Sequence, residues 1–249
     1  MSKTITAAIL VIGDEILSGR TQDTNTSYIA RFLGALGIDL REARVVPDVE
    51  KEIVDALNAL RARYTYVFTT GGIGPTHDDI TFESVAAAFG VGVHYHPEAM
   101  AMMEARYKPG EFNAARKRMA LVPIGAELVR NSVSTAPGVH IGNVFVMAGV
   151  PMIMRAMLDA IAPLLERGAV VHSATVQTKV PEGRLAAGLE TIQKAHPDLA
   201  LGSYPYYRED GAGVQLVARG RNLEEVEAAA LEIEAMLRDL GSEGTRVRT

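Results

Sequence analysis

The chain has 249 residues and 48% hydrophobic content, which is enough to bury a core and excludes a disordered protein. Its 25 basic and 30 acidic residues give a formal net charge of −5, and no Lys or Arg run offsets it, so we expect no nucleic-acid partner. The chain has no cysteine for disulfides or thiolate chemistry, no signal-peptide pattern and no apolar run of the roughly 20 residues that span a bilayer, so we expect a cytoplasmic protein without membrane contact.

The first predicted strand, at residues 4–12, leads into a loop that carries paired acids. Asp14 and Glu15 follow this strand directly, and a helix with apolar residues on one face is predicted at 25–36, with Asn25 as its N-cap. In open α/β sheets, ligands bind beyond the carboxyl ends of the strands, which makes Asp14, Glu15 and Asn25 candidate site residues. The alternative is that Asp14 is only a turn residue and that Asn25 only caps the helix.

The segment from Thr69 to Thr81 is the most informative part of the chain. A strand is predicted at 38–46, a helix with Ile53, Leu57 and Leu60 in phase follows, and a third strand at 64–69 precedes this segment. Its glycines allow backbone N–H groups to approach an anion, and a helix that starts at Thr81, as N-cap, adds a partial positive charge. The segment therefore predicts a phosphate site, with these candidate ligand-binding residues: Thr70, Gly71, Gly72, Gly74, Pro75, Thr76 and Thr81.

Two adjacent carboxylates, Asp78 and Asp79, lie in the same segment. They would repel a bare phosphate, so we infer that a divalent cation with oxygen ligands accompanies it. His77, between Thr76 and Asp78, is a weaker candidate for a general base. The alternative interpretation is an ordinary glycine-rich turn with a solvated Asp pair.

The next part of the chain predicts a polar helical stretch at 97–120, whose Arg116 and Arg118 are candidates to neutralise a second phosphate. Val139 to Met147 predicts one buried strand, and Pro151 suits the first position of the helix that follows. Alternating strands and helices of this kind indicate a mostly parallel sheet with helices on both faces. After Gly168 the pattern changes to βαββα, so we predict an α/β domain at 1–168 and a small α+β domain at 169–249.

Several of these motifs, taken together and in order, resemble the molybdopterin-binding-like domain of the competence/damage-inducible protein A (CinA) family. The match runs over residues 4–166 and rests on Gly13 to Leu17, Asn25, Thr69 to Thr81, Thr135 to Gly138 and Ala148 to Pro151. Residues 21–26 and 72–79 are especially similar to the corresponding domain of eukaryotic FAD synthases, and the tail resembles the small α+β domain of CinA proteins. On this resemblance the following residues join the ligand-binding candidates: Gly13, Pro137, Gly138, Gly149 and Pro151.

The resemblance implies a three-layer α/β fold and metal-dependent cleavage of a nucleotide diphosphate such as ADP-ribose or FAD. It implies Mg²⁺, Mn²⁺ or Co²⁺ as the cation, with K⁺ as a further candidate, and a homo-oligomer. The chemistry assigns Asp14, Glu15, Asp78 and Asp79 as catalytic residues that hold this cation. Because the chain ends near residue 249, we expect neither the amidase domain of CinA proteins nor the FAD-synthesising domain. Two alternatives stay open: a module that only binds a nucleotide or pterin, and transfer of adenylate to molybdopterin in molybdenum cofactor synthesis.

Overall fold

A computed structural model describes residues 4–108, 110–208 and 211–247. The chain forms two compact units, Met1–Gly168 and Ala169–Thr249. Each unit has its own hydrophobic core. The units are described separately below.

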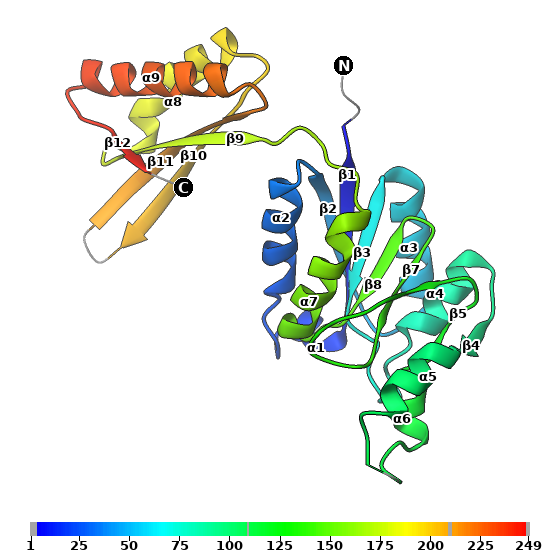
Figure 1. The fold of residues 1–249 in the computed structure, drawn as a ribbon. Coiled ribbons are helices and arrows are strands. Elements are labelled where there is room, and N and C mark those ends of the chain that lie inside the picture. The colour runs from blue at the N-terminus through cyan, green and yellow to red at the C-terminus, as the bar shows by residue number, and fades with distance from the viewer. Residues whose placement is uncertain (1–3, 109, 209–210, 248–249) are drawn as a thin grey trace. The chain divides into compact units, whose positions relative to one another are not determined.

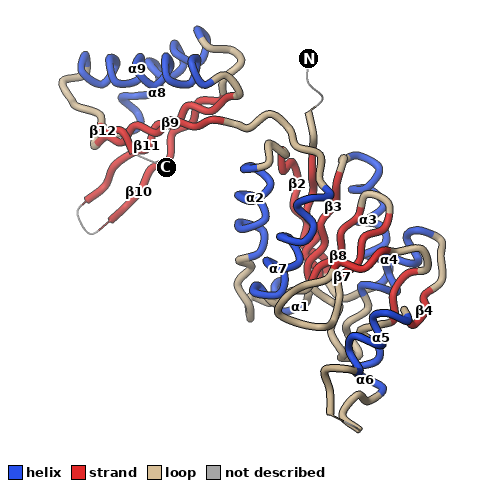
Figure 2. Tube along the Cα trace, viewed as in Figure 1, coloured by secondary structure: helices blue, strands red, loops and turns tan. Residues whose placement is uncertain are grey.

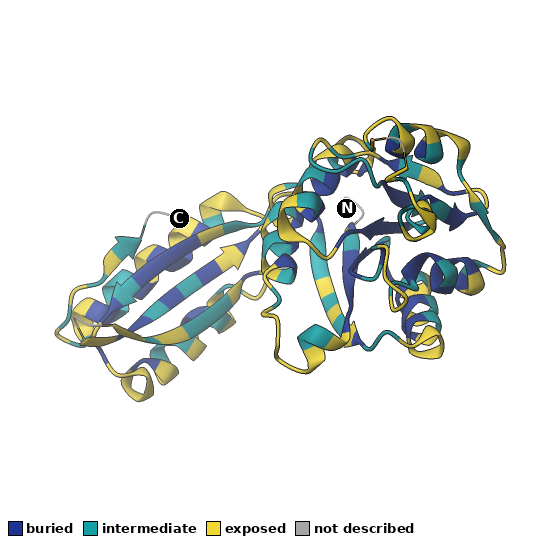
Figure 3. Cartoon of the chain, turned by 90° about the horizontal axis from the view of Figure 1, so that it is seen from below, coloured by how far each residue is buried: buried dark blue, intermediate teal, exposed yellow. Residues whose placement is uncertain are grey.

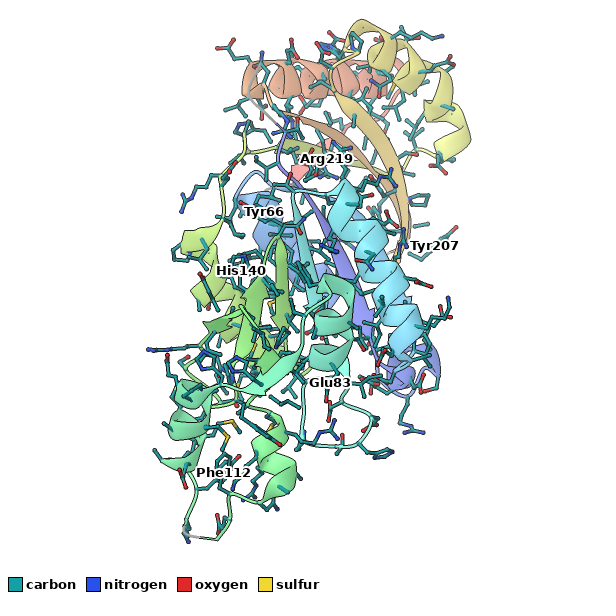
Figure 4. All side chains as sticks on the ribbon, turned by 90° about the vertical axis from the view of Figure 1, so that its right-hand side faces the viewer. Tyr66, Glu83, Phe112, His140, Tyr207 and Arg219 are labelled. Carbon is teal, nitrogen blue, oxygen red and sulfur yellow. The ribbon has the colours of Figure 1, made fainter. Side chains whose placement is uncertain are left out.

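The first unit is built on a six-stranded mixed sheet in the order β2-β1-β3-β8-β7-β6 (Figure 1). Strands β2, β1, β3 and β8 are parallel, while β7 and β6 are antiparallel. Helices α2 and α7 cover one face, and α3 and α4 cover the other, so the sheet is the middle layer of three (Figures 1 and 4). The predicted fold class, a three-layer α/β sandwich with a mostly parallel sheet, is confirmed. The elements are β1 Thr6–Ile12, α1 Asp14–Leu17, α2 Asn25–Ala35, β2 Asp39–Val46, α3 Glu50–Arg63, β3 Tyr66–Thr70, α4 Thr81–Phe89, β6 Glu127–Val129, β7 Gly138–Ile141, β8 Val144–Met147, α7 Pro151–Ile161 and a 3₁₀ turn Ala162–Leu164.

The central strands are buried from end to end, because helices cover both faces of the sheet. Residues 7–12 of β1 are all buried, as are residues 67–70 of β3 and the whole of β8. This explains why these strands appear in the sequence as continuous apolar runs instead of alternating patterns. Figure 2 shows these strands side by side, and Figure 3 shows buried residues concentrated along the strands, with exposed residues on the outer faces of the helices.

The single strand predicted from Val139 to Met147 is wrong, because this segment is the hairpin β7–β8. Ile141 pairs with Val144, which leaves Gly142 and Asn143 as a two-residue loop. Gly142 has a φ of +59°, and no non-glycine residue in the described chain has a positive φ. A glycine with positive φ at the first of two loop positions is typical of a type II′ turn. The hairpin reverses the chain and makes this edge of the sheet antiparallel.

A separate arm, residues 93–123, extends from the first unit. The polar helical stretch predicted at 97–120 is helical only in part: the arm contains α5 (Pro97–Glu104) and the short α6 (Ala114–Arg118), framed by the paired strands β4 (Val93–Tyr95) and β5 (Leu121–Pro123). Met103, Ala99 and Ala120 form its own small core, against which Tyr107, Phe112, Met119 and Ala136 pack. Figure 4 labels Phe112 in this arm.

The second unit is a four-stranded antiparallel sheet in the order β10-β11-β9-β12, with two helices packed on it. Apolar residues of α9 and of alternate strand positions form its core. Its elements are β9 His172–Thr178, α8 Glu182–Ala195, β10 Ala200–Arg208, β11 Gly211–Gly220, α9 Leu223–Asp239 and β12 Thr245–Val247. None of the helices in the described parts of either unit has the length and hydrophobicity of a membrane span.

Candidate functional site

Two adjoining pockets lie where β1, β3 and β8 end, at the carboxyl edge of the sheet. The larger, of about 1090 Å³ with open solvent included, lies against the glycine loop (residues 71–75), the arm and the start of α7. The smaller, of about 370 Å³ measured in the same way, lies between the end of β1, the start of α2 and Thr70. Glu15, Thr21, Gly71, Gly149 and Pro151 line both pockets, which makes them one continuous cleft.

The glycine loop fits tightly against its surroundings and requires glycine at two positions. Gly71 and Gly72 have φ values of +104° and +65°, in the region that disfavours residues with a side chain. A Cβ on Gly71 would lie 2.0 Å from the carbonyl oxygen of Ile12, and one on Gly72 would lie 2.2 Å from Oγ1 of Thr81. The loop therefore packs its backbone directly onto β1 and α4.

The glycine loop also offers hydrogen-bond donors to the cleft. Within the described residues, nothing accepts a hydrogen bond from the backbone N–H of Gly72, Ile73 or Gly74. All three residues line the larger pocket. Consecutive unpaired N–H groups of this kind suit an anion, in agreement with the phosphate-binding interpretation of the loop.

Thr81 stabilises the glycine loop, but it does not cap α4 as predicted. The N-cap is Ile80, and Thr81 is the first residue of the helix. Its side chain is completely buried, and its hydroxyl donates to the carbonyl of Gly71 at 3.0 Å. This hydrogen bond fixes the glycine loop to the start of α4. On the cleft side, Asp79 accepts hydrogen bonds from the N–H and hydroxyl of Thr76, which closes the exposed turn at 76–79.

Carboxylates from three successive strand ends meet at this edge. Asp14 and Glu15 follow β1, Asp78 and Asp79 follow β3, and Asp48, which sequence reasoning missed, follows β2. The N–H of Asp14 donates to Oδ2 of Asp48 at 3.0 Å. Burial raises the pKa of the Asp48 carboxyl, and the negative charges of Asp14, Glu15 and Asp78 raise it further. Asp14 and Asp78 thus both lie near Asp48, but of these five carboxylates only Glu15 and Asp79 line a pocket.

Asp78 has the opposite electrostatic environment. The hydroxyl of Thr76 lowers the pKa of the exposed Asp78 carboxyl, its own backbone N–H contributes, and His77 lowers it further. The His77 side chain is 97% exposed, and its Nδ1 lies 3.9 Å from Oδ1 of Asp78. An imidazole so open to water has nothing to hold it as a general base, so the structure gives this weaker candidate no support.

The donor chemistry at this edge suits a hard divalent cation, because carboxylate oxygens are its preferred ligands. Among the described residues, however, no three Asp, Glu or His side chains are grouped closely enough to hold a metal by themselves. Mg²⁺ is commonly bound by one or two carboxylates together with substrate phosphates and water. The residues therefore fit a cation that binds together with a phosphorylated ligand.

Asn25 lies at the smaller pocket, and its predicted capping role belongs to other residues. The N-cap of α2 is Thr24, and Oδ1 of Asp23 accepts from the N–H groups of Asn25 and Thr26 at 2.9 and 3.1 Å. The side chain of Asn25 is buried and donates through Nδ2 to the carbonyl of Gly149 at 2.8 Å. It thus links the start of α2 to the turn between β8 and α7.

The two predicted arginines lie in different places. Arg118 of the arm contacts the turn at 76–79 and the start of α4, donating to the carbonyl of Asp79 at 3.3 Å and to Glu83 at 3.2 Å (Figure 4 labels Glu83). Arg116 instead lies over the ring of Tyr107 at 4.3 Å and does not line either pocket. Arg118 lines neither pocket either, but its hydrogen bond to Asp79, which does line the larger pocket, makes it the nearer of the two arginines.

The glycines and prolines assigned by resemblance divide into lining and supporting residues. Gly149 and Pro151 line both pockets, and Pro151 begins α7 as predicted. Gly138 begins β7 within the sheet, and a Cβ there would lie 2.3 Å from the carbonyl oxygen of Val146 in the neighbouring strand β8. Gly13 is buried beneath the carboxylate of Glu15, and neither it nor Pro137 lines a pocket.

The larger pocket also contains residues for which the sequence gave no separate signal. Met119 of the arm, Ser134 and Ala136 form part of one wall, and Ile153 and Met157 of α7 form another part. Ala136 lies within the Thr135-to-Gly138 motif, which is a sequence hint to this wall. These mostly apolar side chains give the pocket the mixed lining that is typical of small-molecule sites.

Comparison with known proteins identifies both units. The family described as probable molybdopterin binding domain matches residues 8–167, and the middle domain of FAD synthase matches residues 170–242. A protein from Aeropyrum pernix is 36% identical over 91% of this chain and 90% of its own length. A CinA-like protein from Gemmatimonas aurantiaca is 32% identical over 93% of this chain, which spans only 57% of that relative. A crystal structure of CinA, of unknown function, from Thermoplasma acidophilum has a TM-score of 0.61 and 34% identity, and covers 64% of this chain and 97% of that one.

Proposed function

This chain belongs to the family with the probable molybdopterin binding domain, among its CinA-like members, and from that premise we propose that it hydrolyses the pyrophosphate bond of a nucleotide diphosphate of the ADP-ribose or FAD class. The proposal rests on one observation: the unpaired N–H groups of the glycine loop line the same pocket as the carboxylates of Glu15, which follows β1, and Asp79, which follows β3. The family alone supports a small ligand of the pterin or nucleotide kind.

The proposed cation is held by some of Asp14, Glu15, Asp78 and Asp79, and Glu15 and Asp79 are the two that line the larger pocket. When bound, a divalent ion supplies charge neutralisation, polarises the phosphoryl group and makes bound water more acidic. Mg²⁺, Mn²⁺ and Co²⁺ all accept oxygen ligands of this kind, and K⁺ is a candidate for a supporting charge.

The chain's own residues bind and orient the diphosphate. The N–H groups of Gly72, Ile73 and Gly74 donate to phosphate oxygens and stabilise the charge that develops on them. Arg118, fixed beside the loop by Glu83, adds a positive charge at one edge. Apolar side chains of the larger pocket exclude part of the water around the ligand.

A module that binds a nucleotide or pterin without turnover is the second candidate. The observation that favours it is that, in the described chain, no group of three acidic or histidine side chains is arranged to hold a metal. Adenylate transfer to molybdopterin is a third, and consumption of ATP in the presence of the pterin distinguishes it from hydrolysis. Assembly into a homo-oligomer stays a prediction in every case.

The test is product analysis. The purified chain is incubated with ADP-ribose or FAD and Mg²⁺, Mn²⁺ or Co²⁺, and release of AMP is followed by chromatography, with EDTA as the metal-free control. We expect AMP only with metal, and a loss of at least about 100-fold in rate for Asp79→Asn, the order of effect of removing one electrostatic group from a catalytic site.

The matched control is Asp159→Asn, which removes one carboxylate from an exposed position on α7, outside both pockets. It should leave the rate unchanged. Tight nucleotide binding without AMP release would favour the binding module, and absence of both binding and release would contradict the proposed function.

A further inference from the structure

The smaller pocket contains a buried acceptor that the protein itself does not satisfy. Oδ1 of Asn25 has no hydrogen-bond partner among the described residues and almost no contact with solvent. Asn25 as a whole is only 6% exposed, yet it lines the pocket. Three other buried side-chain atoms in the described chain lack a partner, on Thr26, Thr69 and His96, but none of these residues lines either pocket.

The orientation of this amide is fixed from both sides. Its Nδ2 donates to the carbonyl of Gly149, and the Asp23 carboxylate holds the backbone of Asn25 at the start of α2. With the donor end of the amide occupied, the acceptor end is the one left free. A buried polar atom without a partner destabilises the folded state, and a ligand that donates a hydrogen bond to it removes this penalty.

The rest of the smaller pocket indicates what kind of group fits. Val11, Ile12 and Ile16 give it an apolar side, and Gly71 and Gly149 connect it to the phosphate-binding part of the cleft. Most of the other lining side chains are polar; they include the carboxylates of Glu15 and Asp23, and none of them carries a positive charge. A pocket with an apolar side and several acceptors suits a flat or compact group that carries a neutral donor. A phosphate does not fit this description, because it offers only acceptors at neutral pH.

We propose that the smaller pocket is a separate subsite for the nucleoside end of the ligand, in which Asn25 Oδ1 accepts a hydrogen bond from an N–H or O–H of that nucleoside. This inference rests on the proposed function, since it extends the same cleft. The donor is either the exocyclic amino group of the base or a ribose hydroxyl. Asn25 is then a specificity-determining residue, because a nucleoside without that donor leaves the acceptor unpaired.

The experiment measures, by calorimetry with Mg²⁺, how tightly the wild type and an Asn25 variant each bind a nucleotide and its analogues. Changing the protein and the nucleotide separately and together forms a double-mutant cycle. AMP is the probe, because it has no pyrophosphate bond to cleave. Three analogues each lack one donor: purine riboside monophosphate, 2′-deoxy-AMP and 3′-deoxy-AMP. We expect one analogue to bind the wild type about tenfold more weakly than AMP, and to bind Asn25→Ala as well as AMP does, since the cycle isolates the pairwise interaction.

Thr69→Val is the matched control. It removes another buried, unpaired polar atom, from a residue in β3 that lines neither pocket. It should bind AMP like the wild type and retain the same preference among the analogues. If Asn25→Ala does not fold, Asn25→Ser replaces it, because the shorter side chain does not reach the same point.

Each outcome is decisive. Equal affinity of the wild type for AMP and all three analogues overturns the inference without any variant, as does an analogue preference that survives in Asn25→Ala or Asn25→Ser. In both cases AMP still binds, so the proposed function stands. Absence of AMP binding to the wild type contradicts the proposed function itself.

Discussion

Replacing Gly72 with alanine tests whether the tight glycine loop is what holds the site together. Gly72 has a φ of +65°, and a new Cβ would lie 2.2 Å from Oγ1 of Thr81. That oxygen cannot move freely, because it is buried and bonded to the Gly71 carbonyl. Gly90, at the end of α4, provides a matched control: its φ is +67°, and a Cβ there meets nothing within 4 Å.

Both substitutions place an alanine at a positive φ, so both carry the same backbone strain. Only Gly72→Ala also brings the new Cβ into contact with Thr81. A residue with a side chain in the left-handed region costs about 1–2 kcal/mol. Overpacking adds typically 1–3 kcal/mol at Gly72 only, or else Thr81 rotates and its hydrogen bond, of about 0.5–1.5 kcal/mol, is lost. We therefore expect the free energy of unfolding to fall by about 1–2 kcal/mol in Gly90→Ala and by about 2–4 kcal/mol in Gly72→Ala.

The assay is urea unfolding followed by circular dichroism, paired with AMP binding by calorimetry. Gly72→Ala should also weaken AMP binding, whereas Gly90→Ala should not. The double variant Gly72→Ala/Thr81→Ala should be less destabilised than the sum of its single variants, because the contact is gone. Equal destabilisation by Gly72→Ala and Gly90→Ala, with unchanged AMP affinity in both, would refute the packing argument.

Three further predictions concern the charged groups around the cleft. Because the folded chain raises the pKa of Asp48 above its ordinary 3.8, ionisation of Asp48 opposes folding, so Asp48→Asn should raise Tm at neutral pH, and this gain should disappear as the pH falls through the raised pKa toward 3.8. Asp78 has a lowered pKa and contributes stability above 3.8 that is lost in acid, so Asp78→Asn should lower Tm at neutral pH and not at low pH; a pH series of thermal unfolding checks both signs. Arg118→Gln should cost less than about 1 kcal/mol of stability, since the pair with Glu83 is partly exposed, but should weaken AMP binding, and an unchanged Kd would remove Arg118 from the site.

The parts of the fold that depend on local patterns were predictable from the sequence. β1, β3 and α2 begin and end close to the predicted residues, because buried parallel strands are continuous apolar runs and helices between them keep their periodicity. The hairpin β7–β8 was missed for the same reason. Both of its strands are apolar, and only Gly142 and Asn143 interrupt a run that otherwise indicates one buried strand.

The missed carboxylate shows why a site is harder to predict than its motifs. Asp48 belongs to no recognisable motif, but β1 and β2 are parallel and pair Ile12 with Val46. Two residues further along each strand come Asp14 and Asp48, and they are in contact. Only the register places them together, and the register follows from the packing of the whole sheet.

The carboxyl edge of the sheet carries both hydrogen-bond donors that attract an anion and carboxylates that repel one. Any ligand of the cleft must be compatible with both. Unpaired N–H groups of the glycine loop favour an anion, while the carboxylates of Glu15 and Asp79 in the same pocket disfavour one. A phosphate binds well there only when a cation offsets the carboxylates, and a cation finds too few ligands there without phosphate oxygens. Each ligand must therefore increase the affinity of the other by the same factor. A nucleotide whose Kd does not change with Mg²⁺ would show that the carboxylates and the glycine loop do not act on one ligand.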